Sequence, residues 1–121
     1  MISILIPTYN YTVFPLVENL HSQCENADLV YEILVLDDAS TDKNTSEENS
    51  KINELTNSNF EILQKNIGRS KIRNLLAEKA KYDWLLFLDA DTFPSSSEFI
   101  INYIKSINSE NAIVYGGINY P

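Results

Sequence analysis

Residues 84–91 read Trp-Leu-Leu-Phe-Leu-Asp-Ala-Asp, an apolar run of five residues that leads directly into two carboxylates. A short, continuous apolar run bounded by polar residues is typical of a strand that is buried on both faces. The same pattern occurs at residues 2–6, where Pro7 ends the run, and at residues 32–36, which a second pair of aspartates follows. These three stretches predict three buried strands with polar residues at their carboxyl ends.

Segments whose apolar residues recur at helical spacing separate the runs. Pro15 suits a first helical turn, and Ser70 is predicted to cap a later helix. Ser95 and Glu98 have the spacing of a capping box, which predicts the start of a further helix. The predicted helices cover residues 14–23, the end of the stretch 39–55, residues 70–80 and residues 95–107.

Two shorter runs complete the pattern. Residues 60–63 predict a strand, and residues 112–115 predict a last one that Gly116 and Gly117 close. The resulting alternation of strands and helices predicts an α/β fold, a mostly parallel sheet with helices on both faces. A length of 121 residues accommodates one domain with a core of its own.

Composition excludes several classes of protein. Hydrophobic residues make up 44% and charged residues 21%, as in a soluble globular domain. A formal net charge of −8 argues against nucleic acid and anionic membranes as partners. The apolar runs are too short to cross a bilayer and no signal peptide is recognisable, so no transmembrane segment is expected. The single cysteine, Cys24, forms no internal disulfide and favours a cytoplasmic location.

The carboxyl ends of the predicted strands carry the residues suited to chemistry. Ligands of open α/β sheets collect at these ends. The first strand is followed by Pro7-Thr8-Tyr9-Asn10, the second by Asp37-Asp38 and the fourth by Asp89-Ala90-Asp91. If these strands are neighbours, the three polar segments surround one crevice. Because the chain is acidic, a polyanionic ligand in this crevice needs a metal ion or a few well-placed Arg and Lys residues.

Asp89 and Asp91 are candidates for metal binding. In extended backbone, residues two apart point to the same side, so both carboxylates reach one point. Oxygen ligands without histidine or cysteine nearby favour Mg²⁺ or Mn²⁺. The alternative is that Asp91 caps a turn and that Asp89 is solvated.

Two further pairs have binding and structural interpretations. Asp37 and Asp38 accept hydrogen bonds from ligand N–H groups, or they form an Asx-type turn with the polar residues 40–42 that follow them. Arg69 and Arg73 lie four residues apart and either bind a pyrophosphate or remain solvated on a helix surface. His21 and Cys24, both isolated, are interpreted as packing or surface residues.

Together these segments resemble family 2 glycosyltransferases of the GT-A fold. The resemblance spans nearly the whole chain, and four motifs occur in the family's order and spacing. The matching segments are Ser3-Ile4-Leu5-Ile6-Pro7-Thr8-Tyr9-Asn10, Glu32-Ile33-Leu34-Val35-Leu36-Asp37-Asp38-Ala39-Ser40-Thr41-Asp42, Asn66-Ile67-Gly68 with Arg73-Asn74, and Leu86-Phe87-Leu88-Asp89-Ala90-Asp91.

The resemblance implies a role for each motif. Pro7, Thr8 and Tyr9 line the pocket of the nucleotide base. Asp38 accepts from the base N–H, and Asp37 supports it or reaches the ribose. Arg73, with Arg69 as the less certain second arginine, closes the nucleotide site. Asp91 ligates a Mg²⁺ or Mn²⁺ ion that bridges the two phosphates, and Asp89 faces the ribose or the water shell of that metal.

The resemblance also implies a reaction and a domain organisation. A sugar passes from a nucleoside-diphosphate donor, most commonly a UDP-sugar, to a hydroxyl of a saccharide or lipid-linked acceptor, with inversion. Residues 1–121 correspond to the Rossmann-like, nucleotide-sugar-binding half of the domain, whereas the acceptor half and the general base are expected beyond Pro121. The full-length protein is then expected in the cytoplasm or at the inner face of the membrane. Apolar surface left uncovered predicts a homodimer.

Three other classes of protein share parts of this pattern. Asp89-Ala90-Asp91-Thr92 resembles the first motif of haloacid-dehalogenase-type phosphatases, with Asp89 as nucleophile and Asp91 as acid/base. That motif normally opens its domain, and no acidic pair follows it here. A receiver-like module carries its acidic pair after the first strand, which ends here in Thr-Tyr-Asn. A non-catalytic nucleotide-binding or scaffold domain of the same fold is the remaining alternative.

Overall fold

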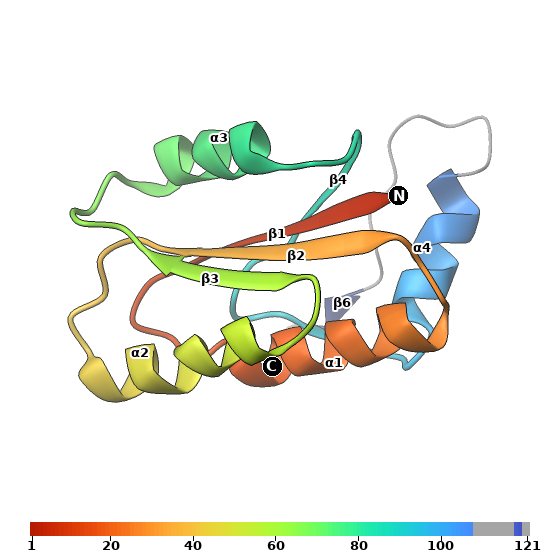
Figure 1. Ribbon diagram of the computed structural model, residues 1–121, viewed down its shortest axis with the longest axis horizontal. Coiled ribbons are helices and arrows are strands. Elements are labelled where there is room, and N and C mark those ends of the chain that lie inside the picture. The colour runs from red at the N-terminus through yellow and green to blue at the C-terminus, as the bar shows by residue number, and fades with distance from the viewer. Residues whose placement is uncertain (108–117, 120–121) are drawn as a thin grey trace.

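The computed structural model describes residues 1–107 and 118–119, and within them four parallel strands form the central sheet (Figure 1). The order across the sheet is β3-β2-β1-β4, so the first strand lies between the second and the fourth. This arrangement confirms the predicted α/β fold with a parallel sheet. The strands are β1 (Ile2–Thr8), β2 (Tyr31–Asp37), β3 (Ser58–Ile62) and β4 (Trp84–Phe87).

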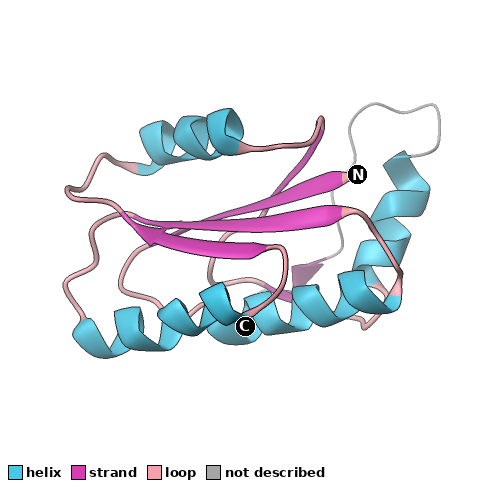
Figure 2. Ribbon diagram, viewed as in Figure 1, coloured by secondary structure: helices cyan, strands magenta, loops and turns pink. Residues whose placement is uncertain are grey.

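Helices cover both faces of this sheet (Figures 1 and 2). One face carries α1 (Phe14–Asn26) and α2 (Lys43–Ser50), which the 3-10 helix η1 (Lys51–Glu54) continues. The opposite face carries α3 (Arg69–Lys79). The helix α4 (Phe99–Ile107) packs against α1. Two short strands, β5 (Phe93–Pro94) and β6 (Ile118–Asn119), pair antiparallel apart from the main sheet.

The core is divided by the sheet into two layers. Alternate residues of β1 and β2, such as Ile4 and Ile33, pack on the side of α1, whereas Leu5 and Leu36 pack with Ile72 of α3 on the other side. Because both layers are apolar, the central strands read as continuous hydrophobic runs rather than as alternating ones. No helix within residues 1–107 is long and apolar enough to span a membrane.

Cys24 lies on α1 and belongs to the core layer between this helix and the sheet, as its interpretation as a packing residue predicts. Its side chain is fully buried. Burial, and to a smaller extent the charge of Glu25, raises the pKa of the thiol to about 12. The thiol therefore stays protonated at neutral pH and is not a nucleophile. His21, the other isolated residue, hydrogen-bonds Thr56 through its ring Nε2, with 2.9 Å to the Thr56 hydroxyl.

The first strand is longer than predicted because Pro7 does not end it. The carbonyl of Leu5 accepts from the N–H of Leu88, towards β4, whereas the carbonyl of Thr8 accepts from Asp38, towards β2. By this alternation the missing N–H of Pro7 faces the β4 side, where the ladder has already ended at Phe87. The proline therefore removes no hydrogen bond between strands.

Both predicted serine caps are wrong, because the helices begin elsewhere. The helix α3 begins at Arg69 with Gly68 as its N-cap residue, which leaves Ser70 inside the first turn. The helix α4 begins at Phe99, four residues after Ser95. Its first turn is capped instead from α1, where the Gln23 side-chain oxygen accepts from the N–H of Ile100 over 2.9 Å. The predicted strand at residues 112–115 lies outside the described residues.

A buried carboxylate fastens the loop that leads into β4. One oxygen of Glu32, on β2, accepts from the Ser3 hydroxyl and from the backbone N–H of Lys81. The Ser3 oxygen in turn accepts from the N–H of Tyr82 over 3.2 Å. Glu32 is 7% exposed, so its bonds are shielded from water. This network sets the start of β4, the strand that leads to Asp89.

Two substitutions of Glu32 are predicted to destabilise the fold to different extents. Glu32→Ala leaves the buried Ser3 hydroxyl and the part-buried Lys81 N–H without their acceptor and should lower the free energy of unfolding by about 2–4 kcal/mol. Glu32→Gln keeps an accepting oxygen and should cost only about 1 kcal/mol. Urea unfolding followed by circular dichroism measures both. An alanine variant within about 0.5 kcal/mol of the wild type would show that the network contributes nothing.

Candidate functional site

A pocket of about 370 Å³ opens at the carboxyl ends of β1, β2 and β4. The strand order makes these three ends neighbours, so the polar segments surround one crevice, as expected. The sequence singles out nine residues as candidates for nucleotide or metal binding. Seven of them line the pocket, whereas Asp37 and Arg73 do not. The lining consists of Pro7, Thr8, Tyr9, Tyr11, Asp38, Arg69, Ile72, Asp89, Ala90 and Asp91.

Asp37 and Asp38 face opposite sides of the sheet. Side chains alternate along a strand, and Val35 packs in the layer of α1 whereas Leu36 packs in the layer of α3. Asp37 follows Val35 and is fully buried, and its Oδ1 accepts from the N–H of Ser40 over 2.6 Å. This is the Asx-type turn of the alternative interpretation. Its Oδ2 is buried and has no hydrogen-bond partner within the described residues.

Asp38 lines the pocket and holds the turn that precedes α3. Its two oxygens accept from the N–H groups of Ile67 and Gly68, over 2.7 Å and 3.0 Å. The Asn66 amide returns a bond to the Asp38 carbonyl over 3.0 Å. Gly68 has a φ of 88°, a conformation that side chains disfavour, although nothing lies within 4 Å of where a Cβ would be. The Asn-Ile-Gly motif is thus explained by backbone geometry.

Asn10 joins the loop after β1 to the loop after β2. It adopts a left-handed conformation with a φ of 48°. Its side-chain oxygen accepts from the N–H groups of Thr41 and Asp42, over 2.8 Å and 3.1 Å. Its own N–H donates to the Ser40 hydroxyl over 2.7 Å. The loop that carries Tyr9 and Tyr11 is therefore tied to the neighbouring loop on one side.

Asn49, on α2, fastens the other side of the same loop. Its oxygen accepts from the N–H groups of Val13 and Phe14 at the start of α1, over 2.8 Å and 3.2 Å. Its amide donates to the Tyr11 carbonyl over 2.9 Å. The Asn49 side chain is fully buried, and its bond to the Val13 N–H is protected from water. Asn49 thus caps α1, whose own N-cap residue, Val13, makes no side-chain cap bond.

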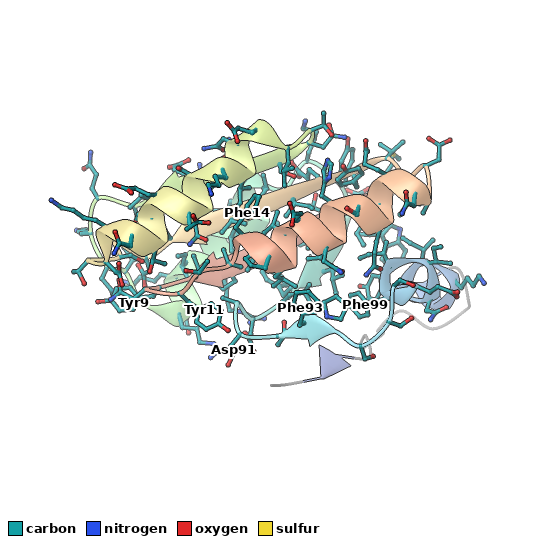
Figure 3. The ribbon with its side chains drawn as sticks, turned by 90° about the horizontal axis from the view of Figure 1, so that it is seen from below. Tyr9, Tyr11, Phe14, Asp91, Phe93 and Phe99 are labelled. Atoms are coloured by element: carbon teal, nitrogen blue, oxygen red, sulfur yellow. The ribbon has the colours of Figure 1, made fainter. Side chains whose placement is uncertain are left out.

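Asp89 and Asp91 both line the pocket, but the backbone between them is not extended as predicted. The N–H and the hydroxyl of Thr92 both donate to the Asp89 carbonyl, over 3.1 Å and 2.6 Å, which closes a turn. Figure 3 shows Asp91 on the same side of the molecule as Tyr9 and Tyr11. The turn, rather than strand alternation, therefore brings the carboxylates into the crevice.

The two arginines have different surroundings. The Arg69 guanidinium forms an ion pair with Asp89, 2.9 Å from Nη2 to Oδ1, inside the pocket lining. The Arg73 guanidinium lies over the Phe87 ring, 4.6 Å from its centroid. The structure thus brings Arg69 to the pocket and leaves Arg73 one turn further along α3.

The candidate metal ligands among the described residues are two carboxylates, Asp89 and Asp91. No group of three or more His, Cys, Asp or Glu side chains is placed there to hold an ion. Asp89 and Asp91 offer hard oxygen ligands and leave most of a coordination shell open. Such a pair fits a Mg²⁺ or Mn²⁺ ion whose remaining ligands come from water and a bound phosphate.

Three lining residues were not predicted. Tyr11 follows Tyr9 by two residues in the same loop, and this spacing is the one signal that points to it. Ile72 is part of the apolar stripe of α3, and Ala90 separates the two aspartates. Nothing in the sequence distinguishes Ile72 from a core residue, because it is buried and also borders the pocket.

Known proteins share this sequence pattern. The family model described as Glycosyl transferase family 2 matches residues 3–121. Two proteins of Haemophilus influenzae, each named an uncharacterized glycosyltransferase, are 30% and 32% identical over 119 and 93 residues. The matches cover 95% and 77% of this chain but only 38% and 37% of the relatives, so the chain spans little more than a third of their length.

Solved structures share the fold. Staphylococcus aureus TarS 1–349 superposes with a TM-score of 0.72 at 28% identity, over 88% of this chain and 32% of that one. The complex of TarS 1–349 with UDP-GlcNAc superposes with a TM-score of 0.69 at 29% identity, over 88% of this chain and 31% of that one. The mannosyltransferase PcManGT from Pyrobaculum calidifontis, in complex with GDP-Man and Mn²⁺, superposes with a TM-score of 0.69 at 20% identity. This match covers 90% of this chain and 32% of that one. The family match and the sequence relatives favour the glycosyltransferase interpretation over the phosphatase and receiver alternatives.

Asn49→Ala is predicted to loosen the loop that carries Tyr9 and Tyr11. The substitution removes the three hydrogen bonds of a fully buried side chain. Backbone amides of residues 11–14 should therefore exchange with deuterium at least about tenfold faster, as expected for a local loss of about 1.4 kcal/mol or more. Hydrogen–deuterium exchange measures this.

Asn53→Ala is the matched control for this experiment. Asn53 makes a similar pair of bonds to the backbone of Phe60, with 2.8 Å for the accepted bond and 3.2 Å for the donated one, away from the pocket. Its loss should affect the exchange near Phe60 and spare residues 11–14. Equal protection of residues 11–14 in both variants would refute the role of Asn49.

Proposed function

Because the chain belongs to glycosyl transferase family 2, we propose that its pocket binds the nucleoside-diphosphate part of a sugar donor. The observation that carries this proposal is the convergence of Asp38, Arg69, Asp89 and Asp91 on one crevice at the strand ends. It offers hydrogen-bond acceptors for a base at one end and an arginine with two carboxylates for a metal-bound diphosphate at the other. Open α/β sheets bind nucleotides in this position.

Asp38 is assigned to the base. A carboxylate has about four acceptor positions, and the N–H groups of Ile67 and Gly68 use two of them. The remaining positions are available to a base N–H. Tyr9 is 50% exposed at the pocket and offers a ring for stacking, and Thr8 and Pro7 complete the wall. We assign uridine as the base, which the TarS complexes with UDP and UDP-GlcNAc support.

Asp91 and Asp89 are assigned to a divalent metal, Mg²⁺ or Mn²⁺. The chemistry of the donor set fits, because both ligands are carboxylate oxygens and the net charge of −8 leaves the chain in need of a cation to receive a diphosphate. When bound, the metal neutralises charge that develops on the leaving diphosphate. The fixed turn at Asp89 and Thr92 holds both carboxylates in place before the donor arrives.

The proposed reaction is displacement at the anomeric carbon, with inversion, by the hydroxyl of a saccharide or lipid-linked acceptor. The chain contributes donor binding to this reaction: it holds the base at Asp38 and orients the diphosphate between Arg69 and the aspartates. No described residue is assigned as the general base. The chain spans 38% of the length of one relative. The transfer reaction is therefore proposed for the whole protein, and donor binding is proposed for this chain.

Self-association also stays a prediction. Trp84 is 42% exposed on β4, which is an edge strand within the described residues. Exposed apolar side chains on an unpaired edge favour association between copies. Light scattering at increasing protein concentration should show a homodimer, and a monomer throughout the range would contradict this.

Calorimetric titration of UDP with and without Mn²⁺ tests the donor site. Binding should require the metal, and Asp91→Asn should weaken it at least about tenfold, since a charged ligand to the metal is worth 1.4 kcal/mol or more. Asp83→Asn is the matched control, because it changes the same charge on an exposed residue before β4, at the far end of the strand. If the wild-type chain binds neither UDP nor GDP, whether Mg²⁺ or Mn²⁺ is present, the proposal is wrong.

A further inference from the structure

The ion pair between Arg69 and Asp89 lies at the position where a metal-bound diphosphate is proposed to sit. Three ion pairs occur within the described residues, and this is the one that joins two residues of the pocket lining. The others, Lys51 with Glu48 and Lys79 with Glu61, involve no lining residue. Arg69 is 71% exposed and Asp89 is 35% exposed, so the pair is open to water and to a ligand.

Charge balance explains why the ion pair between Arg69 and Asp89 forms in the protein without ligand. Asp89 and Asp91 are two residues apart and border one crevice, where two carboxylates repel each other unless a cation lies close. The Arg69 guanidinium supplies that cation, 2.9 Å from Asp89. It therefore takes the electrostatic role that a divalent ion fills in the loaded site.

We propose that Arg69 is an exchangeable cation, bound to Asp89 in the empty pocket and transferred to the diphosphate when metal and nucleotide enter together. On this scheme Asp89 exchanges a guanidinium for a metal, and Arg69 exchanges a carboxylate for phosphate oxygens, which its planar fork matches equally well. The exchange involves ion pairs, hydrogen bonds and metal–oxygen contacts, and no covalent bond is made or broken. The inference rests on the proposed function and adds to it a coupling between metal binding and nucleotide binding.

The geometry of α3 permits this movement. Arg69 is the first residue of the helix, and its side chain is mostly exposed, so it rotates without disturbing the core. The turn before it stays in place, because Asp38 holds the N–H groups of Ile67 and Gly68. The backbone at Arg69 is thus anchored while the guanidinium is free to change its partner.

Exchange has a consequence that simple binding lacks. In the absence of nucleotide, a metal ion must displace Arg69 from Asp89, so Arg69 lowers the affinity for metal alone. In the presence of the diphosphate, the displaced Arg69 gains a new partner and raises the affinity for nucleotide. Metal and nucleotide therefore bind cooperatively. Exposed ion pairs are weak, so the competition should change the metal affinity by about two- to fivefold.

Arg69→Gln separates these two effects because it should move them in opposite directions. The dissociation constant of Mn²⁺ alone, measured by the electron paramagnetic resonance signal of free Mn²⁺, should fall about two- to fivefold. The dissociation constant of UDP in saturating Mn²⁺, measured by calorimetry, should rise about tenfold. Arg69→Lys keeps the charge but not the fork, so it should leave Mn²⁺ binding near the wild-type value and weaken UDP binding.

Lys71→Gln is the control for the change in net charge. Lys71 lies two residues along the same helix, where it is exposed and does not line the pocket. It should therefore produce neither the gain in Mn²⁺ affinity nor the opposite shifts. Circular dichroism confirms that each variant is folded.

Two results overturn the proposal in distinguishable ways. Suppose that the wild-type chain binds UDP with Mn²⁺. If Arg69→Gln then weakens or leaves unchanged the binding of Mn²⁺ alone, or if it matches Lys71→Gln in both measurements, the exchange is refuted and the donor site stands. If the wild-type chain binds no nucleotide with metal, the proposed function fails and the exchange with it.

Discussion

The parallel pairing of β1 with a strand on each side is the constraint from which the rest of the structure follows. Its residues pair in register with β2 from Ile2 to Thr8 and with β4 from Ile2 to Leu5. With helices on both faces, β1 is enclosed on four sides and is almost wholly buried. Parallel strands end at the same edge, so this pairing places three loops beside one another. The pocket is the space between those loops.

Polar side chains of three residues then give the loops a defined shape. Asn10 binds the loop after β2, Asn49 binds the start of α1 and Asp38 binds the turn before α3. Each side chain satisfies two backbone N–H groups that would otherwise lack partners at a loop or helix end. The residues that face a ligand, among them Tyr9 and Arg69, are therefore carried by backbone that is already in place. This preorganisation lowers the entropic cost of binding.

The sequence is sufficient to predict the architecture and most of the pocket, because buried runs such as residues 32–36 and the polar residues that follow them are local signals. It is less informative where orientation depends on a partner far along the chain. Arg69 and Arg73 are indistinguishable by spacing, and the contact of Asp38 with Gly68 decides where α3 begins and so which arginine reaches the pocket. Asp37 and Asp38 likewise differ only in the face to which each points. The turn at Asp89 depends on the Thr92 hydroxyl, which strand periodicity does not anticipate.

The central claim is that one crevice holds the base at Asp38 and the metal at Asp91. A crystal structure of the chain with UDP and Mn²⁺, with anomalous scattering recorded at the manganese edge, tests it directly. The account predicts a single anomalous peak in contact with the Asp91 carboxylate and the diphosphate, with the base N–H donating to Asp38. Manganese bound away from Asp91, or a nucleotide whose base lies outside the walls formed by Thr8, Tyr9 and Asp38, would contradict it.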